Sequence, residues 1–228
     1  MKIVIMGFMA FFLLISMSFS EEIPYEEIKS CYDKSYAFEN QKRYTNAITA
    51  LKPIYLNYPN TYTVNYRLGW LYYLNQNYAN ALDHLNRAAA IFPQSTEIIQ
   101  MMIYVYQAKA DWETIEMLSV QWLKKDYYNI SGNYWYAVSL KMQGKYSLAI
   151  KISNKMLVLQ PTSTIFMQEL GENLYLSNYL EESKSIFGNL LILYPGNATA
   201  IYYLNKMQKI LSVIAKPLNP YYRSSQMN

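Results

Sequence analysis

Apolar residues recur at intervals of three and four along most of the chain, which is the spacing of one face of an α-helix. Residues 66–93 contain two such runs, one with Leu68 and Leu71 and one with Leu82 and Leu85. The polar letters NQN separate the two runs and predict a turn. This stretch is therefore predicted to be a hairpin of two antiparallel amphipathic helices.

The hairpin pattern repeats with a period of 34 residues. Ala81 falls in phase with Ala47 and Ala149, and four prolines share another phase. These prolines are Pro59, Pro93, Pro161 and Pro195. Proline lacks an N–H group and disfavours helical geometry in the residue before it, so it is expected to end the second helix of each hairpin. A fixed period of this length indicates a repeat architecture.

Small residues in one phase of the repeat predict that the two helices of a hairpin cross closely at those positions. Gly69 lies on the first helix and Ala81 on the second, and Gly171 has the phase of Gly69. A large side chain at these positions would push the helix axes apart. The third repeat carries Ile115 in place of the small residue, so we expect a wider crossing there.

The most regular repeat resembles the tetratricopeptide repeat (TPR) at Leu68, Gly69, Tyr72, Tyr78, Ala81, Leu85, Ala88 and Pro93. The resemblance covers residues 28–197 as five units, which are 28–61, 62–95, the degenerate 96–129, 130–163 and 164–197. It implies an all-α fold, a right-handed α-α superhelical solenoid of helical hairpins whose first helices line a concave face. Residues 198–214 are expected to form a capping helix over the last hairpin.

The two ends of the chain are predicted to lie outside the repeats. Residues 1–20 place one lysine before an apolar run and end in the letters SFS, which is typical of a cleavable signal peptide. An uncleaved anchor helix is the alternative, but the apolar run is short and interrupted. Residues 21–27 form a lead-in, and residues 215–228 a flexible tail. We expect an exported protein, periplasmic or extracellular, with no membrane span after leader cleavage.

Charge and composition narrow the function classes. The formal net charge is +4 over 228 residues, which is too mild and too scattered to indicate nucleic-acid binding. The sequence has one histidine, His84, and one cysteine, Cys31, so it offers no metal-ligand cluster and no histidine-cysteine pair. We expect no enzyme activity, no cofactor and no metal. His84 is expected at the surface, and Cys31 as a small packed residue.

The concave face is expected to be aromatic, because the chain carries 25 tyrosines and tyrosine suits half-buried binding surfaces. The TPR resemblance projects these ligand-binding residues into the groove: Tyr32, Tyr36, Tyr66, Trp70, Tyr73, Gln100, Tyr104, Gln107, Tyr134, Lys141 and Tyr175. It places further residues on the same side: Lys29, Glu39, Thr63, Val138, Gln168 and Glu172. Tyr36, Trp70 and Tyr104 form one series at the repeat spacing, which is either a recognition stripe or packing between repeats.

The resemblance implies a binding scaffold. TPR proteins that bind chaperones clamp a terminal carboxylate with lysine and asparagine, but the corresponding positions here are Tyr32, Tyr36, Tyr66 and Trp70. Affinity would therefore depend on burial of aromatic rings. We expect an exported scaffold that binds a partner protein or extended peptide, as an adaptor in envelope assembly. The alternative is a carbohydrate-binding scaffold associated with secreted polysaccharide, because aromatic faces also suit sugar rings.

Overall fold

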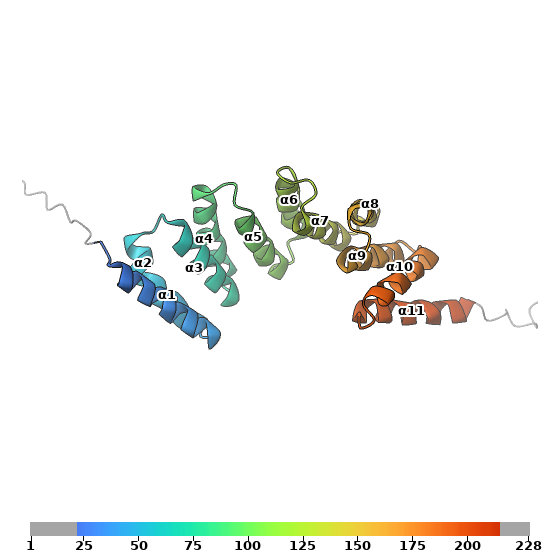
Figure 1. The fold of residues 1–228 in the computed structure, drawn as a ribbon, viewed down its shortest axis with the longest axis horizontal. Coiled ribbons are helices and arrows are strands. Elements are labelled where there is room, and N and C mark those ends of the chain that lie inside the picture. Colours follow the sequence, from blue (N-terminus) through green and yellow to red (C-terminus); the bar gives the residue numbers. More distant parts are fainter. Residues whose placement is uncertain (1–21, 215–228) are drawn as a thin grey trace, which may run out of the picture.

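The computed structural model describes residues 22–214, and within that range the chain forms eleven α-helices (Figure 1). They are α1 (Tyr25–Asn40), α2 (Tyr44–Asn57), α3 (Tyr62–Leu74), α4 (Tyr78–Ile91), α5 (Thr96–Ala108), α6 (Trp112–Leu123), α7 (Ile130–Met142), α8 (Tyr146–Leu159), α9 (Thr164–Leu176), α10 (Leu180–Leu193) and α11 (Ala198–Ile214). The predicted signal peptide at 1–20 and the predicted tail at 215–228 lie outside the described residues.

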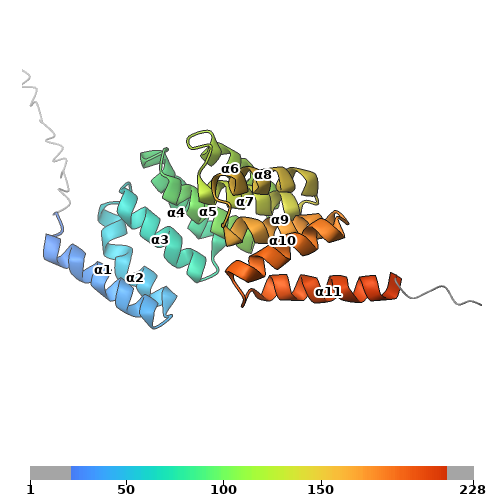
Figure 2. The ribbon, with the colours of Figure 1, turned by 45° about the vertical axis from the view of Figure 1, so that its right-hand side comes forward.

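Consecutive helices pack as hairpins, and the hairpins follow one another along the long axis of the molecule (Figure 1). The helix α1 lies at one end and α11 at the other, as the turned view in Figure 2 also shows. The predicted all-α solenoid of hairpins is confirmed. In the part of the chain described here, no helix combines the length and the apolar character needed to cross a bilayer.

The backbone keeps the repeat period even where the sequence pattern is weak. The turn inside each of the five hairpins contains one residue with φ between 54° and 74°. These residues are Lys42, Gln76, Ala110, Gly144 and Asn178, spaced by 34 residues. Ala110 belongs to the degenerate third hairpin. Since it shares the positive φ of the other four residues, that hairpin turns in the same way as the others.

The close helix crossings occur where small residues predict them. A Cβ atom added to Gly69 would lie 2.8 Å from Cδ2 of Leu85, and one added to Gly171 would lie 2.7 Å from Cε1 of Phe187. In the third hairpin Ile115 is fully buried, and α5 and α6 approach each other along less of their length than α3 and α4 do. This weaker contact agrees with the wider crossing expected where Ile115 replaces a small residue.

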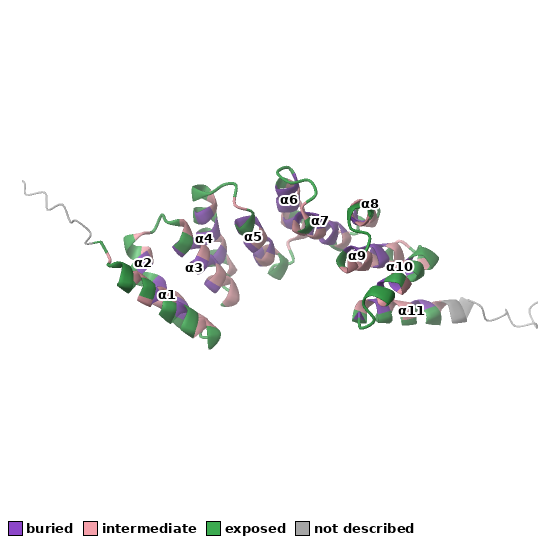
Figure 3. Ribbon diagram, in the orientation of Figure 1, coloured by how far each residue is buried: buried purple, intermediate pink, exposed green. Residues whose placement is uncertain are grey.

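The apolar core runs from hairpin to hairpin instead of closing within each one (Figure 3). One cluster of buried side chains includes Leu85 of α4, Ile98 and Ile103 of α5, Ile115 of α6 and Trp135 of α7. Each hairpin therefore buries apolar surface of its neighbour, which is how repeat arrays gain stability. Cys31 belongs to a second such cluster at the α1 end, and its expected packing as a small buried residue is confirmed.

The prediction of a surface position for His84 is wrong. Only 7% of His84 is exposed, and its ring packs against those of Tyr55 and Tyr72, with centroid distances of 4.9 and 5.3 Å. Its Nδ1 atom lies 2.9 Å from Oδ1 of Asn65. Burial among rings lowers the pKa of His84 below its ordinary value, because the charged form loses its water.

Buried asparagines fix the loops between hairpins. Nδ2 of Asn65 donates hydrogen bonds to the carbonyl oxygens of Pro59 and Thr61, both at 2.7 Å. Asn133, two repeat periods later, makes the equivalent pair of bonds at 3.0 and 2.8 Å to the loop before α7. These bonds tie each asparagine side chain to two carbonyl oxygens of the preceding loop and so hold the loop against the following helix.

Candidate functional site: an aromatic groove on α1, α3 and α5

A groove of about 750 Å³ lies on the first helices of the first three hairpins. We call it the inner groove, and it is defined by the residues that line it: Tyr32, Tyr36, Glu39, Asn40, Tyr62, Thr63, Tyr66, Arg67, Trp70, Glu97 and Met101. The lining comes from α1, α3 and α5, which are separated by α2 and α4 along the chain. The stacking of hairpins therefore brings these side chains together.

Four of the predicted ligand-binding residues line the inner groove. They are Tyr32, Tyr36, Tyr66 and Trp70. Glu39 and Thr63, which were expected on the same side, line it as well. The other predicted residues lie elsewhere: Tyr73, Gln100, Tyr104, Gln107, Tyr134, Lys141 and Tyr175.

An ion pair between α1 and α3 lies beside the aromatic rings of the inner groove. Nη1 of Arg67 lies 2.5 Å from Oε2 of Glu39, and Nε1 of Trp70 donates a hydrogen bond to Oε1 of the same carboxylate at 2.5 Å. The guanidinium of Arg67 also lies over the ring of Tyr36, 3.9 Å from its centroid. Glu39 therefore fixes the orientation of Trp70, and Arg67 supports one face of Tyr36.

A second polar contact joins α3 to α5. The Tyr62 hydroxyl donates a hydrogen bond to the carboxylate of Glu97, and its oxygen lies 3.0 Å from Oγ of Ser95. The ring of Tyr62 is stacked with that of Tyr66, at a centroid distance of 6.0 Å. Burial, together with the carboxylate of Glu97, raises the pKa of Tyr62 to about 12. The phenol is therefore neutral at physiological pH.

Aromatic contacts continue from the inner groove along the array. Centroid distances are 5.6 Å for Trp70–Tyr73, 6.5 Å for Tyr73–Tyr104, 5.9 Å for Tyr104–Trp135 and 5.2 Å for Trp135–Tyr134. Gln100 donates a hydrogen bond to the Tyr104 hydroxyl at 2.5 Å. Tyr104 thus contacts rings from both neighbouring hairpins, whereas Tyr36 and Trp70 line the groove. Within the series at the repeat spacing, Tyr104 therefore packs between repeats, and ligand recognition by Tyr36 and Trp70 stays a prediction.

Lys141, another predicted ligand-binding residue, forms ion pairs within the protein. Its Nζ atom lies 3.0 Å from the Glu169 carboxylate and 2.6 Å from Oε2 of Glu172, and 12% of its side chain is exposed. Burial raises the pKa of Glu169, although Lys141 acts in the opposite direction. This network joins α7 to α9.

The remaining predicted residues differ in their surroundings. The ring of Tyr175 contacts that of Tyr203 on the last helix, with a centroid distance of 4.8 Å. Tyr175 thus helps to pack α9 against α11. Gln107, near the end of α5, is exposed.

Five residues of the inner groove escaped the sequence analysis, namely Asn40, Tyr62, Arg67, Glu97 and Met101. Arg67 was missed because a charged residue is ordinarily expected in solvent, and here only 6% of it is exposed. A usable signal was present, since Arg67 and Met101 are one repeat period apart. Residues in one phase of a repeat face the same way.

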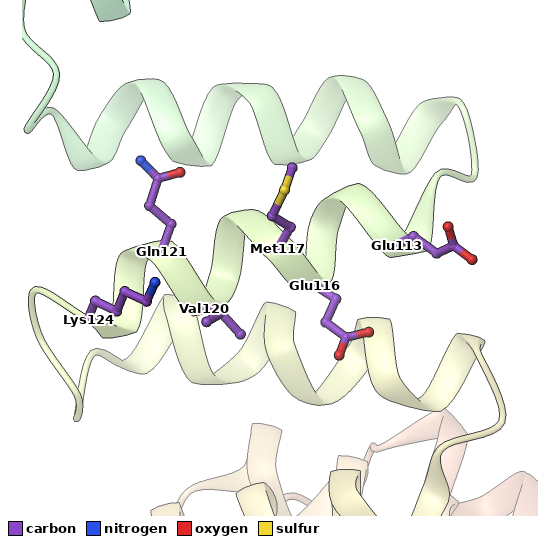
Figure 4. A pocket seen from close by; sticks show the side chains of 6 residues that line it. All are labelled: Glu113, Glu116, Met117, Val120, Gln121 and Lys124. Atoms are coloured by element: carbon purple, nitrogen blue, oxygen red, sulfur yellow. The ribbon is translucent and has the colours of Figure 1, made fainter.

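A second concave region lies on α6 and is less suited to binding. It measures about 480 Å³, and its six side chains all project from α6 and the residue that follows it (Figure 4). They are Glu113, Glu116, Met117, Val120, Gln121 and Lys124. Because a single segment lines it, this region lacks the convergence of elements found in the inner groove. Within residues 22–214, no three His, Cys, Asp or Glu side chains lie where they could hold a metal ion.

Comparison with known proteins supports the repeat assignment. The family model of the tetratricopeptide repeat matches residues 32–96. The chain is similar in structure to a tetratricopeptide repeat protein from Parabacteroides merdae, with a TM-score of 0.73 and 16% identity over 82% of this chain and 74% of that chain. No curated protein sequence matches it.

Two structures of MamA are also similar. For MamA from Desulfovibrio magneticus the TM-score is 0.66 at 13% identity, over 76% of this chain and 98% of that chain. For MamA of AMB-1 the TM-score is 0.60 at 18% identity, over 78% of this chain and 97% of that chain. The resemblance expected from the sequence is confirmed, and the fold is that of a TPR array. At these identities the likeness establishes the fold alone.

Proposed function

We propose that this TPR array is an exported adaptor that binds a partner protein by holding an extended peptide segment in the inner groove. The observation that carries the proposal is the lining of the groove. Five aromatic side chains converge there from α1 and α3, namely Tyr32, Tyr36, Tyr62, Tyr66 and Trp70. Tyrosine and tryptophan supply most of the binding energy in many protein interfaces, because they bury a large area with few rotatable bonds.

The rings are held in place before any partner arrives, which favours binding. Trp70 is fixed by its hydrogen bond to Glu39, Tyr62 by its bond to Glu97, and Tyr36 by the guanidinium of Arg67. Rings that are already ordered lose little conformational entropy when a ligand covers them. The charged groups of the groove are engaged with neighbouring side chains, and this arrangement supports a binding role over a catalytic one.

The cellular setting of the proposal comes from the amino-terminal segment. Residues 1–20 have the pattern of a signal peptide, so the mature protein would begin near Glu21. We therefore place the adaptor in the periplasm or outside the cell, in the assembly of an envelope structure.

A peptide selection with residues 21–228 tests the proposal. Short random peptides displayed on phage would be selected on the wild-type protein and then titrated against Tyr36→Ala, Trp70→Ala and Tyr25→Ala. Tyr25 is the matched control, because it lies on the same helix as Tyr36 and is 73% exposed. We expect each groove variant to weaken binding about tenfold or more, as for aromatic hot spots, and Tyr25→Ala to leave it unchanged.

Three results would contradict this function. One is equal binding by all variants, and another is the absence of any peptide that binds the wild-type protein better than Tyr36→Ala. The third is binding on a glycan array that is lost in Tyr36→Ala and Trp70→Ala, which would favour the carbohydrate-binding alternative. Circular dichroism of each variant verifies that the helices are retained.

A further inference from the structure

The inner groove carries an uncompensated negative charge. Its acidic and basic side chains are Glu39, Glu97 and Arg67. Glu39 and Arg67 form an ion pair and neutralise each other. Glu97 accepts a hydrogen bond from the neutral Tyr62 hydroxyl, and within residues 22–214 no lysine or arginine forms an ion pair with it. The groove is thus locally acidic, although the whole chain has a formal net charge of +4.

The phenols near Glu97 stay protonated and add no second negative charge to the groove. Burial, and the Glu97 carboxylate after it, raise the pKa of Tyr66 above its ordinary value. The same two causes raise the pKa of Tyr62. Both hydroxyls therefore stay neutral and can donate hydrogen bonds at physiological pH. The Glu97 carboxylate lies beside the aromatic lining, because it borders the same groove and accepts a hydrogen bond from Tyr62.

The ring faces of the groove suit a cation. A positively charged group is attracted to the face of a tyrosine or tryptophan ring. Arg67 already makes this contact with Tyr36 from the protein side, with its Cζ atom 3.9 Å from the ring centroid. Tyr36 is nevertheless 50% exposed, so the ring retains surface for a second contact. Tyr66 and Trp70, which are partly exposed, line the same groove.

We propose that the inner groove selects a lysine or arginine side chain of the bound peptide, pairing its charge with Glu97 and covering its aliphatic stem with the rings of Tyr36, Tyr66 and Trp70. This inference rests on the proposed function, since it specifies the chemistry of the same ligand. An acidic side chain at that position would face the negatively charged Glu97 carboxylate and be repelled. The groove therefore discriminates by charge as well as by burial.

The selection described above, read for sequence preference, is the first test. We expect the retained peptides to share one lysine or arginine, and replacement of that residue by methionine to weaken binding about fivefold, the range of a partly exposed ion pair. If the retained peptides bind in a Trp70-dependent and Tyr36-dependent way without a shared basic residue, the proposed function stands and this inference fails. If no peptide depends on these rings, both fail.

Glu97→Gln is the second test, with Glu113→Gln as the matched control. Both glutamates are exposed and lie in the first turn of their helices, α5 and α6, so both changes remove the same favourable interaction with a helix N-terminus. Glutamine retains an acceptor for the Tyr62 hydroxyl. We expect Glu97→Gln, but not Glu113→Gln, to lower the affinity for a lysine-containing peptide about fivefold and to reduce the salt dependence of its binding.

The methionine version of the same peptide provides the decisive comparison. Its affinity should be unaffected by Glu97→Gln, because it has no charge to pair. If Glu97→Gln weakens both peptides equally, or weakens neither, the carboxylate does not recognise a basic side chain and the inference is overturned.

Discussion

The guanidinium of Arg67 on α3 and the carboxylate of Glu39 on α1 form an ion pair with an Nη1–Oε2 distance of 2.5 Å, and only 8% of the arginine side chain is exposed. This pair joins the first two hairpins. It also orients Trp70 and supports Tyr36, which line the inner groove. The same contact thus contributes to the stability of the array and to the shape of its candidate binding site.

Removing the charge of Glu39 should destabilise the protein. Glu39→Gln leaves the buried Arg67 guanidinium without its counter-ion, at an expected cost of about 1–3 kcal/mol. Urea unfolding of residues 21–228 measures this cost. Asp33→Asn on the same helix is the control, because its pair with Lys29 is exposed and 3.6 Å long, and it should change stability by less than about 0.5 kcal/mol. Equal effects of the two changes would contradict the structural role of the pair.

Two glycines near each other in sequence should respond oppositely to alanine. Gly171→Ala places a Cβ atom 2.7 Å from the buried ring of Phe187, so the ring or the two helices must shift, at a cost of about 1–3 kcal/mol. Gly188→Ala on α10 meets no atom within 4 Å and should stabilise the helix by about 0.5–1 kcal/mol. Thermal unfolding of both variants distinguishes the two effects. An unchanged unfolding temperature in Gly171→Ala would show that α9 and α10 do not cross tightly at this residue.

The repeat period made most of the fold predictable. Small residues at Gly69 and Gly171, and the prolines in one phase, indicated hairpins that the structure contains. The period also compensates for weak matches, because Ala110 has the same left-handed backbone as Gly144 although alanine does not favour it. Side-chain preference alone would not have placed that turn.

The candidate site was less predictable, because its polar residues are determined by pairwise contacts between hairpins. Tyr36 and Trp70 could be placed from their phase, whereas the burial of Arg67 depends on Glu39 in the preceding repeat. His84 was misplaced for a similar reason, since Asn65 and two rings from other helices enclose it. Such partners have no fixed spacing in the sequence.

The stability of the protein should depend on the protonation of His84. Burial lowers its pKa in the folded state, so below about pH 6.5 the unfolded chain takes up a proton that the folded protein resists. The stabilisation that comes from neutral His84 is therefore complete above the pKa of histidine in the unfolded chain. It decreases as the pH falls below that value and stops decreasing once the pH is below the pKa of His84 in the folded protein. Urea midpoints between about pH 8 and about pH 5 measure this trend.

The sequence contains one histidine, so His84→Gln isolates the effect. The difference in stability between wild type and His84→Gln should narrow as the pH falls from about 7.5 to about 5.5. A difference that stays constant over this range would mean that His84 titrates alike in the folded and unfolded states.

Lys141 should matter more for stability than other lysines. Lys141→Met leaves Glu169, which is 2% exposed, beside Glu172 without their common cation, and breaking such a buried pair costs about 3–5 kcal/mol. Adding Glu169→Gln should recover part of this loss. Lys151→Met, at an exposed position on α8, should stay within about 0.5 kcal/mol of wild type. Equal free energies of unfolding for Lys141→Met and Lys151→Met, measured in urea, would contradict a stabilising role of the ion pairs of Lys141.

Photo-crosslinking tests most directly whether the inner groove is the binding surface. A photoreactive p-benzoylphenylalanine would replace Tyr36, Tyr25 or Met117 in residues 21–228, and each protein would be irradiated with a peptide selected on the wild type. The three side chains are all at least half exposed, at 50%, 73% and 62%, but only Tyr36 lines the groove. We predict a peptide adduct from position 36 and none from positions 25 and 117. An adduct from position 25 or 117, with none from position 36, would contradict the account.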